Sequence, residues 1–219
     1  MKRMKLWIVA AAMVCCGMGM FTSCQDGNKA DAGKQAEETE LSPAEVEEAA
    51  RLKAINRFLV DSIGKHYESG EVCIPCVHIV GTEEQDSDAM MVWGDFWVFN
   101  YNVEADTLMM VSGGDHPGLM RLNKFDNGYM VTGFEQVGDG SDFDPSARRL
   151  FGLKYGDFHK INSDQEAREK ERARSIADYV KENNLTVKFY KDYGWPAVAI
   201  PAEENPAKKL KGLKNQESN

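Results

Sequence analysis

Five strand-like segments crowd the middle of the chain and constrain its fold more than any other feature. Each is rich in β-branched and aromatic residues and is bounded by turn-forming residues, a pattern typical of strands joined by short connections. Asn127-Gly128 between the last two segments favours a type I′ hairpin turn, because both residue types tolerate positive φ angles. The short connections predict an antiparallel meander. The five segments are residues 72–80, 90–101, 107–111, 119–125 and 129–137.

A long helix is predicted before these strands. Ser42 with Glu45 forms a capping box, and Pro43 occupies the favoured first helical position. Apolar residues then recur at steps of three and four, which indicates one apolar face turned toward a core. We expect this face to meet the aromatic side of the second strand. The apolar stripe is Val46, Ala49, Leu52, Ile55, Leu59 and Ile63, and the aromatic residues are Trp93, Trp97, Phe99 and Tyr101.

Helices return after the strands. Asp144-Pro145 caps a short helix, and Ser163 with Glu166 is a second capping box that opens a helix reaching about Asn183. Residues 185–190 and 197–200 are expected to add edge strands. The predicted fold is therefore α+β, with a long N-terminal helix packed on a curled antiparallel sheet and helices at the C-terminal side. This architecture is similar to cystatin-like and nuclear-transport-factor-like folds, a similarity that carries no function.

The N-terminus is a processing signal. Three basic residues precede an uncharged run over residues 6–21, and Phe21-Thr22-Ser23-Cys24 follows. This arrangement resembles the signal peptide and lipobox of bacterial envelope lipoproteins of Bacteroidetes type, with Phe21 in place of the usual Leu. The resemblance implies removal of residues 1–23 and acylation of Cys24 by palmitate-like chains. Two or more chains anchor a protein stably to a membrane.

The predicted organisation has four parts: a signal peptide over residues 1–23, a flexible tether over 24–41, one α+β domain over 42–201 and a disordered tail over 202–219. Loss of the signal takes away three basic residues and no acid, so the net charge falls from −9 to −12. Such an acidic chain excludes nucleic acid as a partner, because phosphates repel it. The expected location is the bacterial envelope, on the outer membrane through the lipid on Cys24, with the periplasmic and surface faces both open.

Cys73 and Cys76 have the C-x-x-C spacing of thiol-disulfide proteins, which suggests a candidate redox pair. The residues that follow them are β-branched, whereas a redox motif sits at a helix N-terminus that lowers the thiol pKa. In an extended strand, residues three apart lie about 10 Å from each other, too far for a disulfide. We favour two strand cysteines, with Pro75 marking a strand edge or bulge.

Two glycine-rich loops supply a second candidate site. In a meander the loop after the third strand and the exit of the fifth emerge at the same end of the sheet, which brings together Asp115, His116, Asp139 and Asp142. Such a candidate ligand rim can bind a divalent cation through its carboxylates or hold a His–carboxylate pair for acid–base catalysis. Gly, Asp and Ser are equally the residues that turns require. The spacing matches neither a calcium loop nor a zinc site, and we expect no cofactor.

A third cluster contains Trp195-Pro196 and the aromatic residues Phe189, Tyr190 and Tyr193. Exposed aromatics can stack on sugars or contact a partner, although we favour core packing here. The sequence thus favours a lipid-anchored envelope protein that binds a partner protein, a glycan or a small ligand. A small hydrolase-like or metal-dependent enzyme that uses the His116 rim and a thiol-disulfide protein that uses Cys73 and Cys76 are the alternatives. Whether the chain is an enzyme stays open.

Overall fold

The computed structural model describes residues 42–202. The predicted signal peptide, the lipid on Cys24, the tether before Ser42 and the tail after Ala202 lie outside these residues. Among residues 42–202 no helix is long and apolar enough to cross a bilayer.

The first helix begins at the predicted capping box. The Ser42 hydroxyl accepts the backbone N–H of Glu45, and the Glu45 carboxylate accepts the backbone N–H of Ser42 at 2.8 Å. The α-helix α1 spans Pro43–Phe58 and continues through a π-helical turn, η1 (Leu59–Ile63), and a 3₁₀ turn, η2 (Gly64–His66). The predicted long N-terminal helix is confirmed.

The five predicted strands are all present, and two short ones follow. The longest, β2, lies at the centre: β1 pairs along one of its edges, while β3 and β4 pair in succession along the other. Every pairing is antiparallel except that of β6 with β3. The strands are β1 (Val72–Glu84), β2 (Ala89–Glu104), β3 (Thr107–Asp115), β4 (Gly118–Phe125), β5 (Gly128–Gln136), β6 (Phe189–Lys191) and β7 (Val198–Ala199).

The meander prediction is wrong at one point, because β4 pairs with β2 and not with β3. Asp115 ends β3 opposite Trp97, and Gly118 begins β4 opposite Gly94. Between them the backbone N–H of His116 still donates to the carbonyl of Phe96 at 2.7 Å, and the ladder is interrupted at Pro117, since proline has no backbone N–H to donate. Thus β3 and β4 form one nearly continuous line beside β2 with a break in the middle.

The predicted β4–β5 hairpin is confirmed, although its turn is not type I′. Phe125 pairs with Gly128 across the turn. Gly128 takes a positive φ of 113°, whereas Asn127 does not. A type I turn followed by a glycine at positive φ is the other common way to close a short hairpin.

Three helices follow the sheet: α2 (Phe143–Phe151), α3 (Tyr155–Ser163) and α4 (Gln165–Glu182). The side chain of Asp164, not Ser163, caps α4 by accepting the N–H of Ala167 at 3.0 Å. Asp144 was predicted to cap α2 but lies inside its first turn, where it accepts hydrogen bonds from Arg148 and Tyr155.

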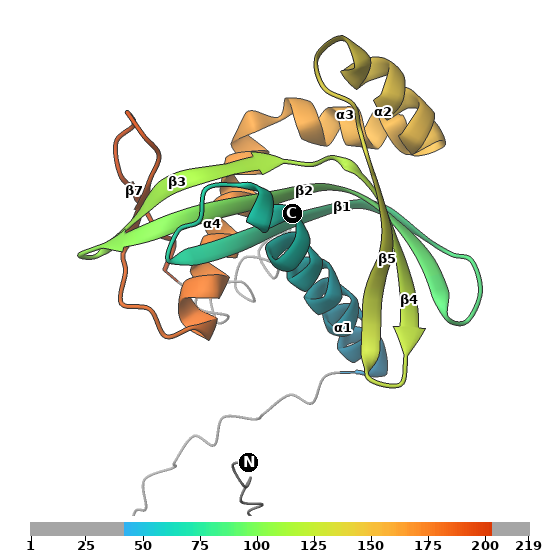
Figure 1. Ribbon diagram of the computed structural model, residues 1–219, viewed down its shortest axis with the longest axis horizontal. Helices are drawn as coiled ribbons and strands as arrows, with labels where there is room; N and C mark the ends of the chain where they lie inside the picture. Colours follow the sequence, from blue (N-terminus) through green and yellow to red (C-terminus); the bar gives the residue numbers. More distant parts are fainter. Residues whose placement is uncertain (1–41, 203–219) are drawn as a thin grey trace, which may run out of the picture. The chain divides into compact units, whose positions relative to one another are not determined.

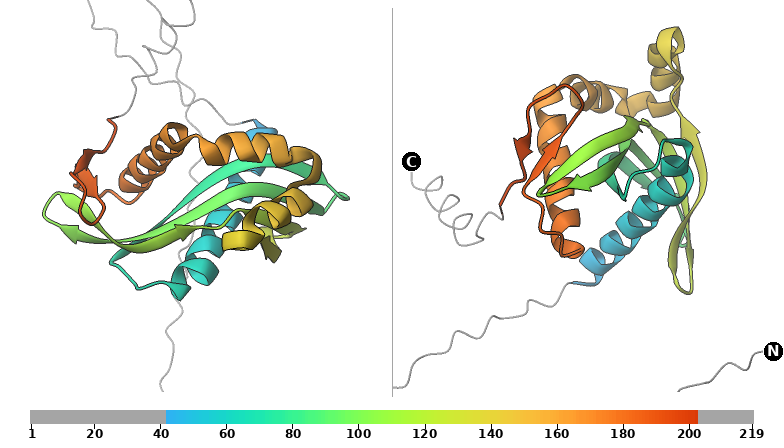
Figure 2. Two further views of the ribbon diagram at one scale, coloured as in Figure 1. Left: turned by 90° about the horizontal axis from the view of Figure 1, so that it is seen from above. Right: turned by 60° about the vertical axis from the view of Figure 1, so that its left-hand side comes forward.

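The sheet is curved and carries helices on both faces, with α1 against one face and α4 against the other (Figures 1 and 2). Successive side chains of β2 point to opposite faces of the sheet, so some pack against α1 and the others against α4. Phe96 packs with Ile55 and Leu59 on the α1 side, whereas Phe99 and Tyr101 pack with α4. The expected contact of the aromatic strand face with the first helix is therefore wrong, because α4 covers Trp97, Phe99 and Tyr101 and the α2–α3 pair covers Trp93.

Candidate ligand-binding site

The two glycine-rich loops of the predicted rim do converge. Pro117 accepts the backbone N–H of Val137 at 2.8 Å, and His116 Nδ1 lies 3.1 Å from the side-chain oxygen of Gln136. The β4–β5 hairpin produces this contact, because the end of β5 must lie beside the start of β4 in an antiparallel pair. The proximity therefore does not require the meander from which it was predicted.

The charged rim residues are divided between different partners. His116 Nε2 is hydrogen-bonded to the hydroxyl of Tyr67 at 2.9 Å, whereas Asp115 accepts from Arg168 of α4 at 2.7 Å. Burial, reinforced by the charges of Asp115 and Asp139, raises the pKa of Tyr67. Among the described hydrogen bonds, none joins His116 to a carboxylate.

Asp139 and Asp142 lie where the chain leaves β5 and enters α2. The 3₁₀ turn η3 (Gly140–Asp142) begins after Asp139, whose carbonyl accepts the N–H of Asp142 at 3.1 Å. The carbonyl of Asp142 in turn accepts the hydroxyl of Ser146 at 2.5 Å. Within residues 42–202 no group of three or more His, Cys, Asp or Glu side chains is arranged to hold a metal ion.

Cys73 and Cys76 both lie in β1 as free thiols. Cys76 belongs to the core beneath α4, whereas the sulfur of Cys73 lies beside Gly64 at the end of the first helix. Burial raises the pKa of Cys73 to about 11 and that of Cys76 to about 12, so both are thiols at neutral pH. Pro75 between them lies in an edge strand, where a missing N–H is tolerated.

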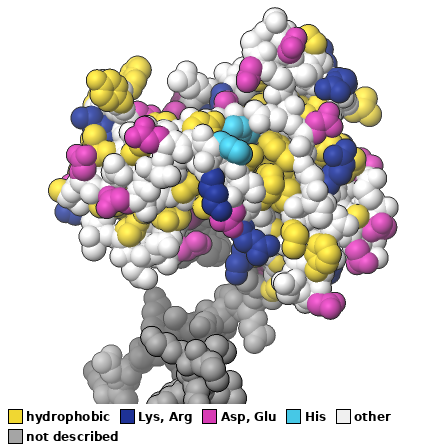
Figure 3. All heavy atoms as spheres, in the orientation of Figure 1, with side chains coloured by type: hydrophobic (Ala, Val, Ile, Leu, Met, Phe, Trp, Pro, Cys, Tyr) yellow, Lys and Arg dark blue, Asp and Glu magenta, His cyan; other side chains and the backbone are white. Residues whose placement is uncertain are grey.

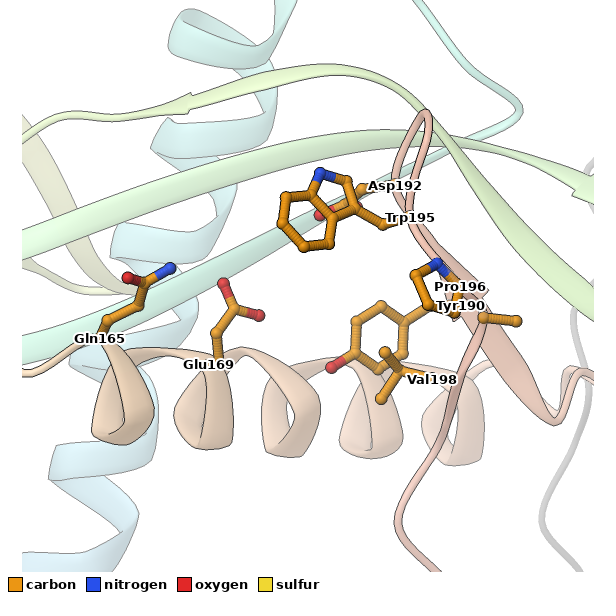
Figure 4. Close-up of a pocket in the computed structure, with 8 residues that line it drawn as sticks. Gln165, Glu169, Tyr190, Asp192, Trp195, Pro196 and Val198 are labelled. Carbon is orange, nitrogen blue, oxygen red and sulfur yellow. The ribbon is translucent and has the colours of Figure 1, made fainter.

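A pocket lies elsewhere, between the N-terminal half of α4 and the β6–β7 hairpin (Figure 4). Its volume of about 640 Å³ falls within the range of small-molecule sites, about 300–1,000 Å³. One wall carries polar side chains of α4 and the other carries apolar side chains of the hairpin. The lining residues are Gln165, Glu169, Tyr190, Asp192, Trp195, Pro196, Ala197 and Val198.

A tight turn presents Trp195 to this pocket. The backbone N–H of Trp195 donates to the carbonyl of Asp192 at 3.1 Å, and Gly194 takes a φ of 77°. A glycine at that angle occupies the third position of a type II turn. Trp195 is 71% exposed and Tyr193 is 96% exposed. The predicted core packing is therefore wrong for both residues, although it holds for Tyr190, which is buried.

The base of the pocket is fixed by a buried arginine. Arg172 is only 3% exposed, and its guanidinium donates to the two oxygens of Asp192 at 2.8 and 2.5 Å. It also donates to the hydroxyl of Tyr101 at 2.8 Å and lies 5.4 Å above the ring of Tyr190. A carboxylate of the pocket wall, Glu169, lies 3.6 Å away. Two pocket residues, Asp192 and Tyr190, are thus held by one guanidinium.

One helical turn earlier, Arg168 contacts a different and incompletely paired group. Asp95 of β2 is 1% exposed, and its nearest cation is Arg168 at 3.6 Å. Burial raises the pKa of Asp95 to about 6, although Arg168 and Trp97 oppose this by favouring the charged form. Trp97 Nε1 does not reach hydrogen-bonding geometry. Four buried polar atoms of this cluster have no hydrogen-bond partner among the described residues: Asp95 Oδ1, Asp95 Oδ2, Trp97 Nε1 and Arg168 Nε.

A second, smaller pocket of about 220 Å³ lies beside the N-terminus of α1. Its carboxylate Glu47 is already engaged, since it accepts from Lys124 at 2.8 Å and from the hydroxyl of Tyr129 at 2.5 Å, whereas Arg51 Nε has no hydrogen-bond partner among the described residues. On the face drawn in Figure 3, acidic and basic side chains are interspersed with apolar ones. These features single out neither that pocket nor a charged patch as a binding site.

The pocket beside Trp195 was missed by sequence reasoning, even though its aromatic residues were noticed. The available signal was Tyr193-Gly194-Trp195-Pro196, a turn motif that places large aromatics where loops meet solvent. The opposite wall comes from α4, and no local pattern connects it to the hairpin. No protein-family model matches the chain, and no curated protein or solved structure matches it either.

Proposed function

We propose that this protein is a lipid-anchored binding module of the bacterial envelope, and that it binds its ligand in the pocket between α4 and the β6–β7 hairpin. The observation that carries the proposal is the exposed indole of Trp195 at the wall of a pocket of about 640 Å³. Tryptophan is a frequent centre of binding energy, since it offers a large rigid surface. The other two tryptophans of the described residues, Trp93 and Trp97, are each 7% exposed.

A rigid support beneath the pocket favours the same function. Binding is strongest when the site is formed before the ligand arrives, because less conformational freedom is lost. Arg172 is stacked on Phe99 of β2 and donates to Asp192 beside the hairpin, so it ties the sheet, the helix and the loop together. The attachment through Cys24 belongs to this proposal and rests on the residues of the signal peptide alone.

The two alternative functions receive less support from the geometry. Acid–base catalysis at the rim requires His116 to meet a carboxylate, and its two ring nitrogens contact Tyr67 and Gln136. Thiol chemistry requires a reactive thiolate, and burial raises the pKa of both Cys73 and Cys76.

Native mass spectrometry of the protein purified from its own envelope in mild detergent tests the proposal. We expect a chain that begins at Cys24 and carries acyl chains, together with an added ligand mass that is absent from Trp195→Ala. Tyr193→Ala is the matched control, since it removes a neighbouring and more exposed aromatic outside the pocket lining. A mature chain without acyl groups contradicts the anchor. Identical masses for the wild type and Trp195→Ala contradict ligand binding at this pocket.

A further inference from the structure

We infer that the pocket beside Trp195 takes a neutral, hydroxyl-rich ring, that is, a sugar unit of a glycan. This inference rests on the proposed function and adds the chemical class of the ligand. It follows from three properties of the pocket: its charge balance, the arrangement of its aromatic and polar walls, and its opening to solvent.

The charges around the pocket disfavour an ionic ligand. An anion would face the carboxylates of Glu169 and Asp192, which both line the pocket. A cation would have to compete with Arg172 for these carboxylates, because Arg172 already donates to the two oxygens of Asp192. Glu169 also lies within 3.6 Å of Arg172. A neutral ligand avoids both conflicts.

The two walls of the pocket match the two surfaces of a sugar ring. Figure 4 shows the indole of Trp195 on one side and the side chains of Glu169 and Gln165 rising from α4 on the other. A pyranose has an apolar face of C–H groups that can lie on an indole and an edge of hydroxyls that donate and accept hydrogen bonds. A carboxylate accepts only, whereas an amide both donates and accepts, so Glu169 and Gln165 can satisfy adjacent hydroxyls.

The pocket is open along the hairpin, which suits one unit of a longer chain. Trp195 and Val198 both line it and both stay largely exposed. A ligand seated on Trp195 can therefore continue out of the pocket in either direction. The structure thus favours a glycan over a small molecule that would need to be enclosed.

Tryptophan fluorescence provides a direct assay, because the mature chain contains only Trp93, Trp97 and Trp195 and the first two are buried. Acrylamide should quench mainly Trp195. We would titrate the mature protein in detergent with a panel of neutral oligosaccharides and, separately, with choline, inorganic phosphate and a proline-rich peptide. At least one neutral oligosaccharide should protect Trp195 from acrylamide, with an affinity that changes little when salt is raised, since no ionic contact is made.

Variants measured by calorimetry show which side chains hold the sugar. Glu169→Gln should weaken binding roughly tenfold, which is about 1.4 kcal/mol, because a neutral acceptor replaces a charged one in the hydrogen bond to the hydroxyl. Trp195→Ala should abolish binding. Glu166→Gln, an exposed neighbour on the same helix, and Tyr193→Ala should bind as the wild type does.

The possible results separate this inference from the proposed function. Protection of Trp195 by choline, phosphate or the peptide, but by none of the oligosaccharides, overturns the sugar and keeps the pocket as a binding site. Oligosaccharide binding that persists in Trp195→Ala overturns both the sugar site and the pocket. A panel in which no probe of any class protects Trp195 also counts against both.

Discussion

Two arginines one helical turn apart on α4 have similar surroundings and very different pairing. Each guanidinium lies over an aromatic ring of β2, Arg168 over Trp97 at 4.4 Å and Arg172 over Phe99 at 4.2 Å. Arg172 donates to both oxygens of its carboxylate partner, Asp192. Arg168 reaches the buried Asp95 only at 3.6 Å and donates instead to the exposed Asp115 and to the carbonyl of Asn162.

The comparison shows that a buried charge stabilises the folded state only where all of its hydrogen bonds are formed. A buried ion pair gains little over apolar packing, but an unpaired member of such a pair is costly. We therefore expect the Arg172 cluster to hold the fold and the pocket together. The Arg168 cluster should lower the stability of the folded state, because both oxygens of Asp95 lack a hydrogen-bond partner among the described residues.

The largest loss of stability is expected when the fully hydrogen-bonded Arg172 cluster loses its guanidinium. Arg172→Met should lower the free energy of unfolding by about 3–5 kcal/mol, because it leaves Asp192 and the Tyr101 hydroxyl without their donor. Urea unfolding at pH 7 measures this change. Arg174→Met, on the exposed side of the same helix, should change stability by less than about 0.5 kcal/mol. A loss below 1 kcal/mol for Arg172→Met would remove the distinction between the two clusters.

The incompletely paired Arg168 cluster should make the free energy of unfolding depend on pH. Because burial raises the pKa of Asp95 to about 6, the folded state keeps a proton that the unfolded chain releases near pH 4. Stability should therefore fall as the pH rises from about 4 to about 6, by roughly 2–3 kcal/mol from this residue. In Asp95→Asn this part of the fall should disappear, as seen in urea unfolding at several pH values.

Asp178→Asn is the control for that experiment, since Asp178 is an exposed acid on α4, the helix that carries Arg168. Its pH profile should follow that of the wild type. An Asp95→Asn profile that also follows the wild type would mean that Asp95 is ionised in the folded state throughout this range.

A smaller loss of stability is expected when each arginine is replaced by lysine, which keeps both positive charges. Lysine keeps the positive charge but cannot donate two parallel hydrogen bonds or stack as a planar group. Arg172→Lys should therefore cost about 1–2 kcal/mol more than Arg168→Lys. Thermal unfolding of the two variants side by side measures this difference, and equal melting temperatures would contradict it.

Much of the fold was predictable from local signals. The capping box at Ser42 and Glu45 fixed the start of α1, and strand-forming residues with turn residues between them located all five long strands. The β4–β5 hairpin was likewise predicted from Asn127-Gly128. These signals act within a few residues of each other, and tertiary contacts do not override them here.

The errors came from non-local contacts. The aromatic face of β2 was recognised, but alternation does not say which helix covers a face, and α4 lies more than sixty residues further along the chain. The pairing of β4 with β2 depends on Pro117, which was noticed only as part of a loop. The partners of Asp115 and His116 follow from which side of the strand each faces, and the sequence left that open.

The interruption of the ladder at Pro117 affects which part of the sheet can open on its own. On one side of this interruption, β4 and β5 form the half of the sheet that packs with α1. On the other side, β3, β6 and β7 form the half that packs with α4. Of the ladders along β2, only β1–β2 runs through both halves. The half that bears the pocket can therefore lose its structure in a local fluctuation while the half built on α1 stays folded, so amide exchange should divide the chain at this proline.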